Sequence, residues 1–242
     1  MTAAGAISGG RSETSPRWIV QPANARYGAI FLIVGAVEFL VGMTIAQVGY
    51  GPSYSVSQNL LSDLGVTSCG IVDSTGRYAC SPWFLAFDAA TILLGFLVVY
   101  GAVWVRRAFP VGQLSTIGLG LLALHGIGLI GAGFTPENVN DSVHTDFALL
   151  AFGCGAGALL VLGLAIRERA LWEGYSPYFV ASGLISAGAL VLFADGAYLG
   201  LGIGGMERLV VAPILLWFAV VGVRIARIPP AALALEPRGV GT

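Results

Sequence analysis

Six stretches of about 20 or more mostly apolar residues constrain this chain more than any other feature of its sequence. A helix that crosses the hydrocarbon core of a bilayer needs roughly 20 such residues. Only 10% of the 242 residues are charged, whereas soluble domains have about 25%. We therefore expect an all-α integral membrane protein, a bundle of six transmembrane helices at about residues 27–48, 83–105, 113–133, 144–166, 177–199 and 208–226.

The segments that flank the six stretches predict a simple domain organisation. Residues 1–26 are rich in Ser, Thr, Gly and Pro and show no apolar periodicity, which is typical of a disordered tail. The transmembrane domain then covers residues 27–226, and residues 227–242 form a second tail. The net charge of −1 gives no indication of a nucleic-acid partner.

Arginines are distributed unevenly between the two sides of the predicted bundle. Both tails and the connections 106–110 and 167–169 carry most of them, whereas the connections 49–82, 134–143 and 200–207 hold only Arg77, with Arg208 directly after the last. Because positive residues favour the cytoplasmic side, both termini are predicted to be cytoplasmic. The 49–82 loop then lies outside the cytoplasm.

Two of the three cysteines, Cys69 and Cys80, lie eleven positions apart in this loop. An extracytoplasmic compartment is often oxidising, so we expect a disulfide between them, with two unpaired thiols as the alternative. The bond would close a hairpin around the turn-rich sequence 73–76. Cys154 is interpreted as a small packing residue within an apolar stretch.

Ionisable residues inside the apolar stretches are the main indication of a functional site. A charge at the centre of a membrane helix costs at least about 2.5 kcal/mol on insertion scales. Counted from the predicted orientation, most of these residues lie in the outer half of the bundle, beneath the 49–82 loop. The sequence therefore predicts a polar pocket there. The residues are Glu38, Asp88, His125 and Asp195 within the stretches, and His144, Asp146, Glu207 and Arg208 at helix starts.

Glu38 and Asp195 are predicted to be buried ionisable groups. Glu38 lies three residues after Gly35 and four before Gly42, on a face of small residues that favours close helix packing. It is either a hydrogen-bonding residue between helices or, with Asp195, a carboxylate of a proton relay.

The two histidines leave several alternatives open. His125 is a packing residue, a general base or a metal ligand. Together, His125, His144 and Asp88 or Asp63 would make a three-ligand zinc set. The sequence contains no HxxxH or HExxH pair, so we predict neither metal nor cofactor, with zinc or haem at the histidines as the alternatives.

The heptad from Asn59 to Gly65 follows the first apolar stretch and reads NLLSDLG. In a helix, Asn59, Ser62 and Asp63 share one face, and the leucines share another. We expect a short amphipathic element at the outer membrane interface, with its polar face at the mouth of the bundle. The alternative is a structural cap whose Asn and Asp satisfy free backbone amides.

This heptad resembles the motif of the DUF998 family of prokaryotic integral membrane proteins. The matching residues are Asn59, Leu61, Ser62, Asp63, Leu64 and Gly65, with His144 as a looser match, and the likeness covers about residues 27–226. The resemblance implies a six-span topology in a prokaryotic plasma membrane and no activity. The motif is distantly similar to that of the Frag1/DRAM/Sfk1-type membrane proteins, which are linked to lipid organisation, and less similar to ceramidase-like hydrolases.

These observations favour a non-enzymatic membrane protein that binds a lipid or small amphiphile in the outer-half pocket. It would act alone, as a homo-oligomer or as an accessory subunit of a larger membrane complex. One alternative is a membrane-embedded, metal-dependent lipid hydrolase that uses Asp63, Asp88, His125 and His144, and another is a proton-coupled transporter. The expected binding residues are Asn59, Ser62, Asp63, Asp88, His125, His144 and Asp146.

Overall fold

The computed structural model describes residues 25–72, 76–229 and 232. Most of the two expected tails, 1–26 and 227–242, lies outside the described residues, and so does most of the expected turn at 73–76. Within these described residues, six helices are long and apolar enough to cross a membrane, which confirms the prediction of a six-helix, multi-pass membrane protein. They are α1 (Ala25–Tyr50), α2 (Phe84–Val105), α3 (Gln113–Phe134), α4 (Asp141–Ala165), α5 (Tyr175–Ala194) and α6 (Gly202–Arg227).

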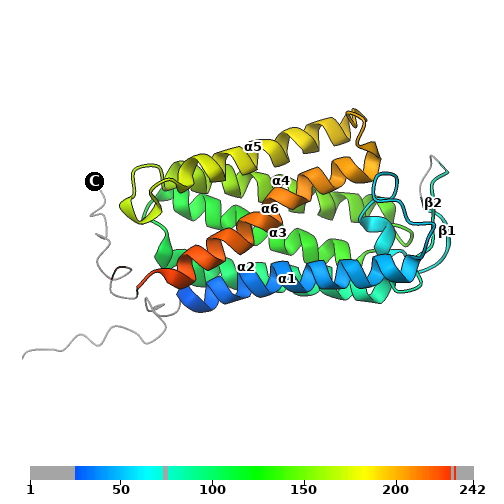
Figure 1. Ribbon diagram of the computed structural model, residues 1–242, viewed down its shortest axis with the longest axis horizontal. Helices are drawn as coiled ribbons and strands as arrows, with labels where there is room; N and C mark the ends of the chain where they lie inside the picture. Colours follow the sequence, from blue (N-terminus) through cyan, green and yellow to red (C-terminus); the bar gives the residue numbers. More distant parts are fainter. Residues whose placement is uncertain (1–24, 73–75, 230–231, 233–242) are drawn as a thin grey trace, which may run out of the picture.

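Consecutive helices run up and down the bundle and pack against one another, and α6 closes the ring against α1 (Figure 1). The short 3-10 turns η3 (Arg106–Ala108) and η4 (Ala170–Trp172) lie at the end where α1 begins and α6 ends. We call this the tail end. The long connection between α1 and α2 lies at the opposite end, which we call the loop end.

Small residues let the helices approach closely, as the glycine spacing of the first stretch predicts. A Cβ atom added at Gly42 of α1 would lie 2.4 Å from the Cβ of Ala90 on α2. At Gly128 of α3, a Cβ would lie 2.6 Å from the backbone nitrogen of Ala151 on α4. Packing of this kind substitutes for the hydrophobic effect, which does not drive helix association within lipid.

Two helix boundaries differ from the predictions by more than three residues, both at the loop end. Helix α5 ends at Ala194 instead of about 199, and glycines with positive φ follow at Gly196 (72°) and Gly200 (82°), a backbone conformation that terminates helices. Asp195 is therefore an exposed residue at the end of α5, and the prediction that it is buried was wrong. Helix α6 begins at Gly202, six residues before the predicted start, because its first turn packs under the α1–α2 connection.

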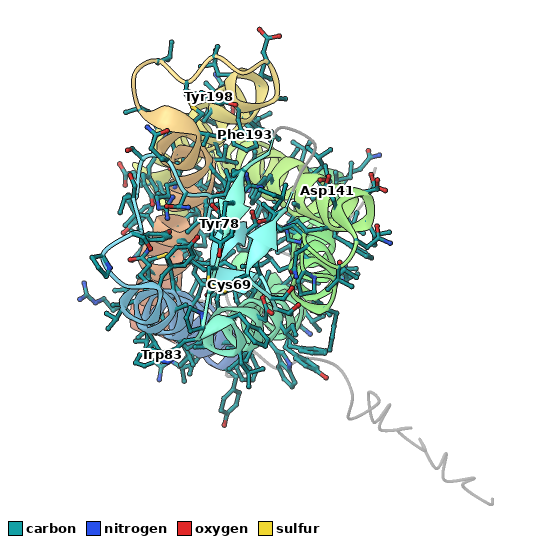
Figure 2. The ribbon with its side chains drawn as sticks, turned by 90° about the vertical axis from the view of Figure 1, so that its right-hand side faces the viewer. Cys69, Tyr78, Trp83, Asp141, Phe193 and Tyr198 are labelled. Atoms are coloured by element: carbon teal, nitrogen blue, oxygen red, sulfur yellow. A yellow bond between two sulfur atoms is a disulfide. The ribbon has the colours of Figure 1, made fainter. Side chains whose placement is uncertain are left out.

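The α1–α2 connection covers the middle of the ring when the bundle is viewed from the loop end (Figure 2). It contains the 3-10 turn η2 (Ser62–Gly65) and the antiparallel strands β1 (Gly70–Ile71) and β2 (Tyr78–Ala79), which pair Gly70 with Ala79. A disulfide joins Cys69 to Cys80 beside these strands, as the sequence predicted. We call its described residues, 51–72 and 76–83, the lid.

Candidate functional site

Asp63 is the centre of the lid, and its side chain has no exposed surface. One carboxylate oxygen forms an ion pair with Arg77. The other accepts hydrogen bonds from the backbone N–H of Leu60 (2.9 Å) and from the amide of Asn59 (3.0 Å). Asp63 and Asn59 are therefore bonded within the lid, in the manner of the structural-cap alternative.

A second buried carboxylate, Glu137, ties the lid to the connection between α3 and α4. Its Oε2 accepts hydrogen bonds from Arg77 Nη2 (3.0 Å) and from the Ser62 hydroxyl (2.9 Å). Arg77 thus bridges two acidic residues that are far apart in the sequence. We call Asp63, Arg77 and Glu137 the Arg77 latch.

Arg208 of α6 holds the other side of the lid. Its Nη1 donates to the backbone oxygens of Val56 (3.0 Å) and Asn59 (2.9 Å), and its Nη2 donates to the Tyr54 hydroxyl. Burial raises the pKa of the Tyr54 hydroxyl, and this effect outweighs the opposing charge of Arg208. The phenol therefore stays neutral near pH 7 and is able to accept this hydrogen bond.

Glycines at the start of α6 allow the lid to lie directly on the helix. The backbone N–H of Gly204 donates to the Ser57 oxygen at 3.0 Å. A Cβ added at Gly204 would lie 2.0 Å from the backbone oxygen of Asn59, which no real structure allows. A side chain at this position would force the lid away from α6.

The leucines of the heptad point into the protein, because the segment forms a 3-10 turn and not the expected amphipathic helix at the membrane interface. Leu61 and Leu64 are 5% and 0% exposed and belong to the main apolar core. The backbone oxygen of Leu64 accepts a hydrogen bond from the Ser81 hydroxyl at 2.7 Å. Gly65 rests against the carboxyl group of Asp88, where a Cβ would lie 2.3 Å from Oδ1.

A partly enclosed cavity lies beneath the lid, between α1, α2, α3, α4 and α6. Its volume of about 70 Å³ is room for roughly five water molecules or for part of an alkyl chain. Most of the wall is apolar, with aromatic side chains such as Phe39, Phe87 and Phe152. The polar side chains that line it include Ser62, Asp88, His125, His144 and Glu207.

Both histidines of the cavity are oriented by backbone oxygens. The Nδ1 of His125 lies 2.7 Å from the Ala151 oxygen, and the Nδ1 of His144 lies 2.9 Å from the Thr135 oxygen. A carbonyl oxygen only accepts, so each Nδ1 carries a hydrogen, and Nε2 of the neutral ring keeps its lone pair. The Nε2 of His125 is buried and has no hydrogen-bond partner in the described part of the chain.

The two carboxyl groups of the cavity differ in their partners. Glu207 is 6% exposed, and its Oε2 accepts the backbone N–H of Leu61 from the lid. Asp88 is 8% exposed, and among the described residues no hydrogen bond or ion pair to its side chain is present. The Asp88 carboxyl group therefore lines the cavity without a protein partner among the described residues.

The structure brings four of the seven expected binding residues to the cavity wall: Ser62, Asp88, His125 and His144. Asn59 and Asp63 instead bond within the lid, and Asp146 is exposed on α4. Glu38 is half-buried on α1, does not line the cavity, and has one oxygen without a partner in residues 25–72, 76–229 and 232.

The seven expected binding residues did not include Arg77, Glu137 or Glu207, of which only Glu207 was among the ionisable residues that predicted the pocket. Arg77 is the one basic residue of the 49–82 loop, which was a signal that it pairs with an acid. Glu207 was seen only as a helix-start residue, because the predicted sixth helix began one residue later. Glu137 lies in a short connection, where the apolar pattern of the sequence does not distinguish a buried carboxylate from an exposed one.

In the described residues, no three His, Cys, Asp or Glu side chains are grouped so as to hold a metal ion. The metal-binding alternative therefore has no ligand set there. Each histidine keeps one free Nε2, yet the carboxyl groups of the same cavity do not complete a set with them.

Comparison with known proteins gives one match. A family model described as "Protein of unknown function (DUF998)" matches residues 33–224, a range that includes the lid and every residue of the cavity wall. No curated protein and no solved structure matches the chain. The expected distant similarity to Frag1/DRAM/Sfk1-type proteins stays a prediction.

Proposed function

The chain belongs to the DUF998 family, and from this premise we propose that it binds a lipid or another small amphiphile in the cavity beneath the lid. The polar end of the ligand would meet Asp88, His125, His144 and Glu207, and its apolar part would lie along the aromatic and aliphatic wall. In the predicted orientation, this cavity would lie in the outer half of the bilayer.

The observation that carries this proposal is the set of unsatisfied polar groups in an apolar, partly enclosed space. The side chain of Asp88 and the Nε2 of His125 have no partner among the described residues. A buried polar group without a partner costs about 1–3 kcal/mol. A ligand that bonds to these groups would recover that free energy, and the surrounding apolar wall matches the usual composition of a ligand site.

Native mass spectrometry of the protein released from its own membranes tests this proposal. We expect the wild-type chain to retain a co-purifying amphiphile, and Ala148→Phe to lose most of it, because Ala148 lines the cavity. Leu149→Phe is the matched control, since the neighbouring Leu149 is exposed on α4 and should leave binding unchanged. A wild-type chain free of any amphiphile, or equal occupancy in Ala148→Phe, would contradict the proposal.

The two alternative functions have less support. A lipid hydrolase that uses a metal would need a ligand set that the described residues do not group together. A proton-coupled transporter that uses Glu38 and Asp195 would need both within the bundle, whereas Asp195 is exposed and Glu38 lies outside the cavity wall. Whether the protein acts alone or in a larger membrane complex does not alter the binding test.

A further inference from the structure

The hydrogen atoms of the cavity's hydroxyl groups and rings are already used by the protein. Ser62 donates its hydrogen to Glu137, and the Thr91 hydroxyl donates to the Phe87 oxygen at 2.9 Å. His125 and His144 donate from Nδ1 to backbone oxygens, as described above. What these four side chains still offer to the cavity is lone pairs, on two hydroxyl oxygens and two Nε2 atoms.

The charged residues of the cavity wall also favour a ligand that donates hydrogen bonds. Asp88 and Glu207 are the acidic residues of the wall, and no arginine of the described chain lines it. The two arginines of the loop end are engaged elsewhere, because Arg77 bridges Asp63 and Glu137 and Arg208 binds the lid. A ligand would therefore meet several acceptors and two acidic groups, and no arginine side chain in the wall.

We propose that the amphiphile bound in this cavity carries a primary ammonium head group, held by the Asp88 carboxylate in a wall whose other free polar atoms, the histidine Nε2 atoms among them, are acceptors. This inference rests on the proposed function. An ammonium group has three donors and no acceptor, so it suits a wall whose free polar atoms are acceptors. A hydrogen bond between an ammonium and a carboxylate is charge-assisted, and roughly twice as strong as a neutral one.

Other head groups complement the cavity less well. A carboxylate or phosphate head would place its acceptor oxygens against the acceptors of the wall, and no hydrogen bond would form between them. A quaternary ammonium could stack on Phe87 or Phe39, but it has no N–H to give, and the lone pairs of Asp88 and His125 would stay unsatisfied. A hydroxyl head provides one donor and no charge, so it is the neutral reference.

The test compares four twelve-carbon probes with different heads: dodecylammonium, dodecyltrimethylammonium, dodecanol and dodecanoate. Binding to the full chain in phosphatidylcholine nanodiscs is measured by titration calorimetry, with empty nanodiscs subtracted. We expect dodecylammonium to bind at least about tenfold more tightly than dodecanol. Asp88→Asn should abolish this preference while dodecanol still binds, which also shows that the variant is folded.

Asp146→Asn is the control for general attraction of cations to the membrane surface, because Asp146 is exposed on the same helix end as His144. It should retain the full preference. Equal binding of dodecylammonium and dodecanol, equal binding of the quaternary probe, or an equal loss in Asp146→Asn and Asp88→Asn would overturn the ammonium inference alone. Failure of all four probes to bind would also overturn the proposed function.

Discussion

Arg77, which lies outside the heptad, stabilises the buried charge of the heptad residue Asp63. The Asp63 side chain is fully buried and Glu137 is 4% exposed, so each depends on a cation for its charge to be stable. Arg77 provides that cation for both, from a position fourteen residues beyond Asp63. The acidic residue of the heptad is thus explained by the stability of the lid.

Replacement of Arg77 by alanine should destabilise the protein by about 3 kcal/mol, since it leaves two buried carboxylates without a positive charge beside them. Thermal unfolding in detergent measures the loss, and hydrogen exchange should show faster exchange of the amides of residues 59–65. Arg106→Ala, an exposed arginine at the tail end, is the matched control and should change neither value. An Arg77→Ala protein with wild-type unfolding and exchange would show that the Arg77 latch does not hold the lid.

At the scale of elements, the lid and the start of α6 form one unit. The backbone of Gly204, the side chain of Arg208 and the carboxyl group of Glu207 each bond to the lid. These contacts join residues about 150 positions apart in the sequence. The lid therefore positions Glu207 in the cavity wall as well as covering the cavity.

Gly204→Ala should displace the lid from α6 and cost about 1–3 kcal/mol, because the new methyl group would overlap the Asn59 oxygen. Gly153→Ala is the matched control, since no described atom beyond its own helix neighbourhood lies within 4 Å of a Cβ there. Alanine favours a helix over glycine, so the control should be neutral or slightly stabilised. Equal unfolding temperatures for the two variants would rule out close contact between the lid and α6.

The same unit explains what could and could not be predicted from the sequence. The six helices follow from apolar length alone, and the disulfide follows from two cysteines in one predicted extracytoplasmic loop. The start of α6 could not be predicted, because lid contacts and not apolar composition hold Gly202–Glu207 in a helix. The outer-half pocket was expected from Asp88, His125 and His144, whereas the inward direction of Leu61 and Leu64 depends on a 3-10 turn that helical spacing does not describe.

At the scale of the whole molecule, the two ends of the bundle differ in chemistry. The loop end holds the lid and the polar cavity. The tail end holds most of the described arginines, such as Arg106, Arg107 and Arg227. By the positive-inside rule, we propose that the tail end faces the cytoplasm. The Cys69–Cys80 disulfide would then form in the compartment that favours it.

Reporter fusions after the last residue test this orientation. Green fluorescent protein at the C-terminus should fluoresce, and alkaline phosphatase there should be inactive, because the first reporter folds in the cytoplasm and the second requires an oxidising compartment. Alkaline phosphatase inserted within the lid is the control and should be active. The reverse pattern would place the cavity in the cytoplasmic half of the membrane and remove the outer-leaflet part of the proposal.

Photo-crosslinking tests the central claim, occupation of the cavity by an amphiphile, most directly. Dodecanol and dodecylamine that carry a diazirine in the chain would be activated on the protein in its membrane, and labelled residues identified by mass spectrometry. We predict labels on cavity-wall residues of α2 and α3, such as Thr91, Leu94 and Leu129, that disappear in Ala148→Phe and persist in Leu149→Phe. Labels confined to lipid-facing residues such as Val37, Leu85 and Leu184, unchanged in Ala148→Phe, would contradict the account.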